Sequence, residues 1–123
     1  MHHVLVIDDQ SAVRASLKLA LTYLGYQVAE AENGEEGLRE ARETTPDLIL
    51  CDFDMPVMDG LQTLVQVRKD PVLGRVPVII ISGMVTADDE RRLMQEGANA
   101  VLLKPFVLAD LTKLMEQWLN SGE

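Results

Sequence analysis

The stretch Leu48-Ile49-Leu50-Cys51-Asp52 is a run of four apolar residues that ends in a carboxylate. The run has no polar alternation, which is typical of a central strand in a parallel sheet covered by helices on both faces. Similar short runs recur along the chain at Val4–Ile7, Gln27–Ala31, Val78–Ile81 and Ala100–Leu103. We therefore predict five strands and expect Gln27–Ala31, the most mixed of them, at an edge of the sheet.

Helical patterns separate these strands. From Val13 to Leu24, apolar residues recur at three- and four-residue spacing, with Ser11 as the expected N-cap and Gly25 as the expected stop. Further helices are predicted over Glu35–Glu43, from an Asp59 N-cap to near Asp70, from a Thr86 N-cap onward, and over Leu108–Trp118. The alternation predicts a doubly wound (βα)5 fold of the α/β class, with a five-stranded parallel sheet covered by helices on both faces. We expect the flavodoxin-like strand order 2-1-3-4-5, because in this order the polar ends of the strands would converge.

Length and composition favour a single soluble domain over residues 1–123. The chain is 47% hydrophobic and 25% charged, as globular proteins are and disordered chains are not. Its formal charge of -9 opposes binding to nucleic acid and to anionic lipid. Cys51 has no second cysteine to pair with, and there is no leader and no apolar run of about 18 residues. We therefore expect no membrane insertion and a cytoplasmic location.

Polar residues stand where the predicted strands end. Ligands of open parallel sheets bind at the carboxyl ends of the strands. At these ends the sequence has Asp8, Asp9, Asp52, Ser82 and Lys104. Clustered carboxylates repel one another unless a cation shares their site, and an oxygen-only ligand set favours Mg2+. Magnesium beside a carboxylate indicates phosphoryl transfer, with Asp52 as nucleophile, Lys104 neutralising one phosphoryl oxygen and Ser82 donating a hydrogen bond to another.

Four blocks of the sequence, in this order and at this spacing, resemble the receiver domain of two-component response regulators. They are Val4–Asp9, Leu50–Gly60, Pro77–Gly83 and Lys104–Phe106. The resemblance implies that Asp52 accepts a phosphoryl group from a sensor histidine kinase or a histidine phosphotransfer protein. It also implies that Asp9, Asp52 and the backbone carbonyl of Asp54 hold Mg2+, with Asp8 helping through water.

The resemblance further implies a signalling switch. The domain would catalyse its own phosphotransfer and slow dephosphorylation without being an enzyme in the ordinary sense. Its output would pass through the face made by helix four, strand five and helix five to a target protein or effector domain, and a homodimer formed on phosphorylation is a further candidate partner. The Lys104-Pro105 bond is commonly cis in these domains. Val101 stands where the family usually has an aromatic switch residue, so the output mechanism of this chain is expected to differ.

Three other interpretations fit parts of the sequence. One is a receiver-like docking module that phosphate does not regulate. Another is a phosphatase of the haloacid dehalogenase type, whose Asp-x-Asp motif matches Leu48–Asp54, although Asp8 and Asp9 precede it and the chain is short for such an enzyme. A flavodoxin would need a phosphate-binding loop rich in Ser, Thr and Gly after the first strand, and the sequence lacks one.

Overall fold

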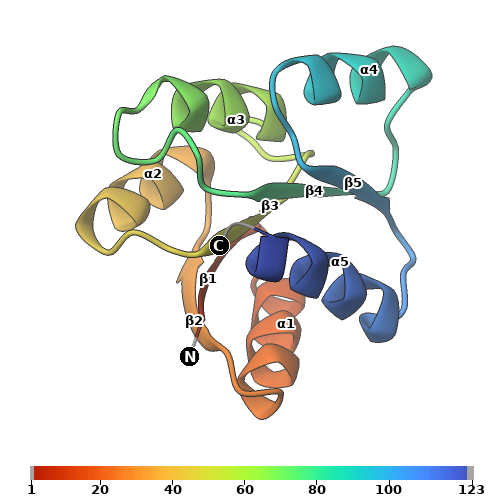
Figure 1. Ribbon diagram of the computed structural model, residues 1–123. Coiled ribbons are helices and arrows are strands. Elements are labelled where there is room, and N and C mark those ends of the chain that lie inside the picture. Colours follow the sequence, from red (N-terminus) through yellow and green to blue (C-terminus); the bar gives the residue numbers. More distant parts are fainter. Residues whose placement is uncertain (1, 122–123) are drawn as a thin grey trace.

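The computed structural model describes residues 2–121, in which five strands alternate with five helices (Figure 1). The strands are β1 (His3–Ile7), β2 (Gln27–Ala31), β3 (Leu48–Asp52), β4 (Val78–Ser82) and β5 (Ala100–Leu103). The helices are α1 (Ser11–Tyr23), α2 (Gly34–Glu43), α3 (Gly60–Lys69), α4 (Ala87–Gln95) and α5 (Leu108–Ser121). The predicted number and order of elements are confirmed.

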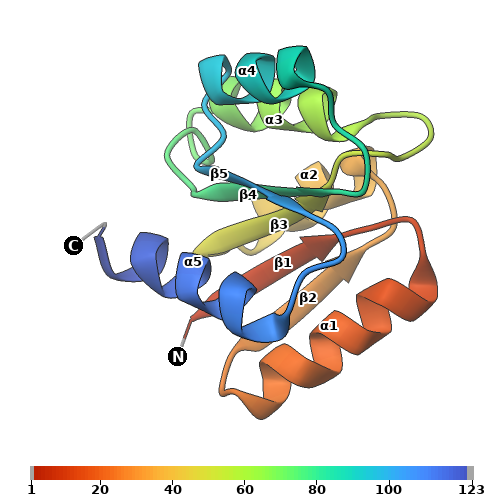
Figure 2. The ribbon, with the colours of Figure 1, turned by 90° about the vertical axis from the view of Figure 1, so that its right-hand side faces the viewer.

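The strands form one parallel sheet in the order β2-β1-β3-β4-β5, as predicted, with β2 at an edge. Helices α1 and α5 cover one face of the sheet, and α2, α3 and α4 cover the other (Figures 1 and 2). In the sheet register Ile7 lies beside Cys51, and Ser82 lies beside Leu103. This register aligns the carboxyl ends of β1, β3, β4 and β5 along one edge.

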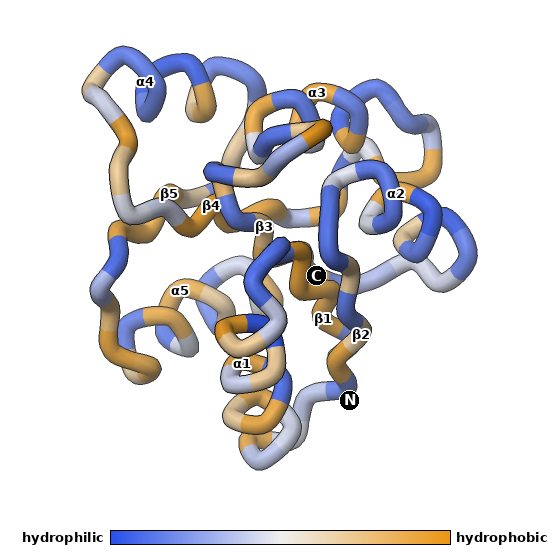
Figure 3. Tube along the Cα trace, turned by 180° about the vertical axis from the view of Figure 1, so that it is seen from behind, coloured by the Kyte–Doolittle hydropathy of each residue, from blue (hydrophilic) through white to orange (hydrophobic). Residues whose placement is uncertain are grey.

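Two hydrophobic cores fill the space between the sheet and its helices. Strand β3 supplies both, because Ile49 and Cys51 face the core under α2, α3 and α4, whereas Leu48 and Leu50 face the core under α1 and α5. All five residues of β3 are buried, which explains why its sequence shows no polar alternation. In Figure 3 the hydrophobic colour gathers on the central strands, whereas α4 is mostly hydrophilic and buries only Leu93.

The helix boundaries follow the predicted signals with one exception. Asp59 and Thr86 cap α3 and α4 in reciprocal capping boxes, and Gly25, with φ of 99°, follows the end of α1. The prediction that Ser11 is an N-cap is wrong. Gln10 occupies the cap position without a side-chain cap bond, and the Asp8 carboxylate accepts a hydrogen bond from the Gln10 backbone N–H at 2.9 Å. The acidic residue before the helix therefore organises its start.

Candidate functional site

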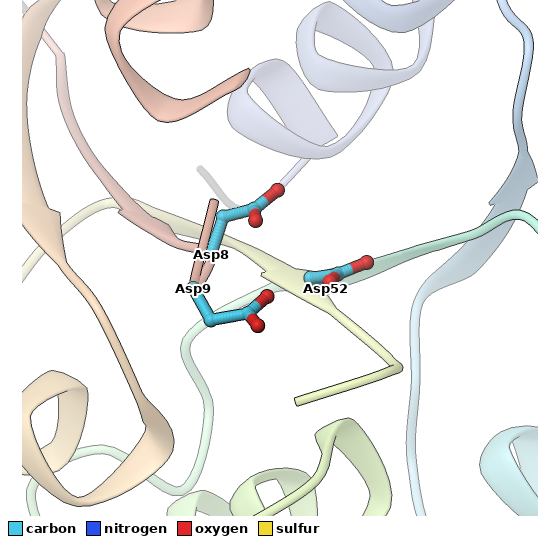
Figure 4. Close-up of side chains that lie close together, drawn as sticks. All are labelled: Asp8, Asp9 and Asp52. Atoms are coloured by element: carbon cyan, nitrogen blue, oxygen red, sulfur yellow. The ribbon is translucent and has the colours of Figure 1, made fainter. Parts of the chain in front are cut away.

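Three carboxylates gather at the edge of the sheet where β1 and β3 end (Figure 4). Asp8 and Asp9 follow β1, and Asp52 is the last residue of β3. One carboxylate oxygen from each of the three lies within 4.8 Å of the others. Asp8 and Asp52 are buried, with 3% and 6% of their surfaces exposed, whereas Asp9 is exposed. The structure thus brings together the carboxylates that the sequence placed at separate strand ends.

Burial and mutual repulsion disfavour the charged forms of the two buried carboxylates. Burial, and next the charge of Asp8, raise the pKa of Asp52 to about 6, although Lys104 opposes the shift. Burial also raises the pKa of Asp8. The cluster therefore holds more negative charge than its own surroundings stabilise, which is the condition under which a cation binds.

Lys104 supplies part of the missing positive charge. Its ammonium nitrogen lies 3.3 Å from Oδ1 of Asp52, and its backbone N–H donates to the carbonyl of Ser82 at 2.8 Å. This backbone hydrogen bond extends the pairing of β4 with β5 by one residue. The sheet therefore places Lys104, the residue after β5, close to Asp52 at the end of β3. The Lys104-Pro105 peptide bond is cis.

The hydroxyl of Ser82 is fully buried and makes two hydrogen bonds. It donates to Oδ2 of Asp54 at 3.2 Å and accepts from the backbone N–H of Met84 at 3.1 Å. The expected role of Asp54 in holding the metal was through its backbone carbonyl, and the sequence did not reveal that its side chain contacts Ser82. Local sequence could not show this contact, because it joins the last residue of β4 to the loop after β3, and only the sheet register brings the two together.

Arg14 is a second neighbour of the site that the sequence did not indicate. Its guanidinium donates to the backbone carbonyl of Asp8 at 2.6 Å and pairs with Glu30 at 3.4 Å. These contacts tie the segment between β1 and α1 to the edge strand β2. Arg14 therefore supports the backbone that carries Asp8 and Asp9.

The donor set suits a hard divalent cation. All three clustered groups offer oxygen, two of them from a buried position, and one side of the cluster is open because Asp9 is exposed. Oxygen ligands with room for water are the preference of Mg2+. The arrangement therefore fits magnesium better than zinc, which takes nitrogen and sulfur ligands in most sites.

The sequence matches a family model and curated proteins along almost its whole length. The model of the response regulator receiver domain matches residues 4–116. The transcriptional regulatory protein PrrA of Mycobacterium tuberculosis is 44% identical over 117 residues, which cover 95% of this chain and 49% of that protein. The probable chemotaxis protein CheY of Rhizobium etli is 39% identical over 118 residues, covering 92% of this chain and 88% of that protein. The chain thus spans about half the length of PrrA but most of the length of CheY.

Solved structures give the same result. Chemotaxis protein CheY4 of Vibrio cholerae superposes with a TM-score of 0.90 at 29% identity, covering 95% of this chain and 98% of that one. The receiver domain of the sensor histidine kinase PA1611 of Pseudomonas aeruginosa has a TM-score of 0.88 at 28% identity, covering 97% and 98%. That structure has a magnesium ion coordinated in its active site cleft. Among the described residues, no helix has the length and apolarity needed to cross a membrane.

The family model covers residues 4–116 of the 123 in this chain, and the sheet has the strand order β2-β1-β3-β4-β5. This chain therefore belongs to the receiver domains of two-component response regulators.

Proposed function

We propose that residues 1–123 act as a single phosphorylation-controlled switch in which Asp52 is the phosphoacceptor. The observation that carries this proposal is the position of Asp52 at the end of β3, buried, 3.3 Å from the Lys104 ammonium and clustered with Asp8 and Asp9. With a pKa of about 6 in the metal-free protein, the Asp52 carboxylate is largely ionised at neutral pH, as a nucleophile must be.

The reaction would be a phosphoryl transfer to Asp52 from the phosphohistidine of a sensor histidine kinase or a histidine phosphotransfer protein. A carboxylate oxygen of Asp52 forms a bond to phosphorus, while the bond between phosphorus and the histidine nitrogen breaks and its electron pair stays on the imidazole. Lys104 neutralises one phosphoryl oxygen, and Ser82 donates a hydrogen bond to another.

Magnesium is the proposed cofactor of this reaction. Asp9, Asp52 and the backbone carbonyl of Asp54 would hold it, and Asp8 would assist through water. When bound, the ion supplies positive charge against the negative charge that spreads over the phosphoryl oxygens. Support comes from the oxygen-only cluster of this chain and from the magnesium-containing structure of the similar receiver domain.

The proposed output surface is the face formed by α4, β5 and α5. Each of these elements carries an exposed large apolar side chain: Met94 in α4 is 47% exposed, Leu103 in β5 is 53% exposed and Leu108 in α5 is 38% exposed. The expected partners are a downstream target protein, an effector domain or a second copy of the chain. The net charge of -9 argues against direct binding of nucleic acid by this domain, and the lone Cys51 favours the reducing cytoplasm.

The test is to incubate the protein with acetyl phosphate, with and without Mg2+, and to measure its intact mass. Wild type should gain one phosphoryl group only with Mg2+, and Asp52→Asn should gain none. Asp88→Asn is the matched control, because the Asp88 side chain lies exposed on α4 and should not affect labelling. Full labelling of Asp52→Asn would reassign the acceptor. No labelling of any variant would favour the docking module, and catalytic turnover of a small phosphate ester with Mg2+ would favour a phosphatase.

A further inference from the structure

The Ser82 hydroxyl already has an acceptor, and that acceptor is not Asp52. It donates to Oδ2 of Asp54 at 3.2 Å, across 28 residues of sequence, and accepts from the backbone N–H of Met84 at 3.1 Å. A serine hydroxyl carries one proton and can donate one strong hydrogen bond at a time. The bond to Asp54 and a bond to a phosphoryl group on Asp52 are therefore mutually exclusive.

The segment that follows Ser82 depends on where this hydroxyl lies. The side chain of Met84 is 84% exposed, and Thr86 two residues later caps α4. Helix α4 buries a single residue, Leu93, so few contacts hold its first turn in place. A rotation of the Ser82 side chain away from Asp54 would also move the oxygen that accepts from the Met84 N–H, in the segment that leads to α4.

We propose that the Asp54 carboxylate is a latch that holds the Ser82 hydroxyl in the unphosphorylated protein and opposes its movement toward the phosphoryl group. The proposal rests on the proposed phosphorylation of Asp52. Asp54 acts here as a positioning residue, since its side chain works through Ser82.

The first test uses unphosphorylated protein in the presence of a chelator. Asp54→Ala removes the acceptor, whereas Asp54→Asn keeps an oxygen acceptor but removes the charge. Hydrogen exchange of the Met84 amide should be about 3- to 10-fold faster in Asp54→Ala than in wild type, the size of one modest hydrogen bond. Asp54→Asn should restore most of the protection. Equal exchange in wild type and Asp54→Ala would overturn the latch, and circular dichroism verifies that each variant is folded.

The second test measures binding of beryllium fluoride, a mimic of a phosphoryl group on a carboxylate, at saturating Mg2+. Removing the Asp54 charge alone reduces repulsion of the anion, so Asp54→Asn measures that effect. Asp54→Ala should bind the probe about 3- to 10-fold more tightly than Asp54→Asn. In a Ser82→Ala background the difference between the two variants should vanish, because no hydroxyl remains to be released.

The outcomes separate the latch from the proposed function. Failure of wild type to bind beryllium fluoride and to take up phosphate would overturn both. Normal binding by wild type, with equal affinities for Asp54→Ala and Asp54→Asn, would overturn the latch alone. A difference between these variants that persisted in Ser82→Ala would also overturn it, because the effect would not pass through the hydroxyl.

Discussion

The Lys104 ammonium lies 3.3 Å from the Asp52 carboxylate, although 52 residues separate the two in sequence. The pair joins the end of β5 to the end of β3, across β4. Even with this cation beside it, Asp52 keeps a pKa of about 6, because burial and the charge of Asp8 outweigh the attraction. Lys104 thus neutralises only part of the negative charge at the site, and a second cation would be needed to neutralise the rest.

Replacing Lys104 should raise the pKa of Asp52 further. In Lys104→Met the carboxylate loses both the charge and the hydrogen bond that now lower this pKa. The measurement is an NMR titration of the Asp52 side-chain carbon in metal-free protein. Lys113→Met, on the exposed side of α5, is the control and should leave the titration unchanged. An unshifted Asp52 titration in Lys104→Met would show that the ion pair does not form in solution.

In the metal-free protein, the contribution of Asp52 to the free energy of unfolding should fall as the pH rises from about 4 to about 6. The pKa of Asp52 is about 6 in the folded protein against 3.8 ordinarily, so the folded state binds its proton more tightly than the unfolded state does. The unfolding free energy contributed by this group therefore falls across that window and is constant above it. Below the window both states are protonated and no penalty exists.

Asp52→Asn isolates this contribution. Relative to wild type it should raise the unfolding free energy by up to about 3 kcal/mol at pH 7, and the difference should shrink toward zero near pH 4. Urea titrations in the presence of a chelator measure it, and added Mg2+ should narrow the gap because the ion stabilises wild type more. A difference that did not change with pH would contradict the raised pKa.

A side chain at Gly60 should distort the site, whereas one at Gly83 should not. A Cβ at Gly60 would lie 2.8 Å from the Cα of Phe53 and 2.9 Å from the carbonyl oxygen of Asp52, which are backbone atoms that cannot turn aside. Gly60→Ala should therefore cost about 2 kcal/mol of stability and weaken Mg2+ binding. Gly83→Ala has nothing within 4 Å and is the matched control on the other side of the site. Urea titrations measure the free energy of unfolding, and Mg2+ titrations measure the affinity for the ion. Equal values of both quantities in the two variants would contradict the predicted backbone clash at Gly60.

The exposed Val57 should limit stability. Its φ is 70°, in the region that β-branched residues avoid, in a tight turn where the Met58 N–H donates to the Pro56 carbonyl at 2.7 Å. Val57 is 82% exposed, so replacing it removes little burial. Val57→Asn should stabilise the protein by about 1 kcal/mol, because Asn tolerates this conformation. Val72→Asn is the control and should not stabilise the protein, because Val72 is 64% exposed and has no positive φ. Equal shifts of the melting temperature in the two variants would show that the backbone at Val57 is not strained.

Much of this protein follows from local sequence. The apolar run of β3, the capping boxes at Asp59 and Thr86 and the glycine after α1 are each set by residues within a few positions of one another. The alternation of strands and helices then leaves few topologies, and these bring Asp8, Asp9 and Asp52 to one edge. That is why the fold and the acidic cluster could be predicted.

Other features exist only in the folded chain. The cap of α1, the bond from Ser82 to Asp54, the support of Asp8 by Arg14 and the positive φ of Val57 all escaped prediction, and for Ser11 the prediction was wrong. Each depends on which of several available partners a polar group meets once the strands are in register. Residue type decides what a group can bond to, but the packed sheet decides what lies within about 3 Å of it.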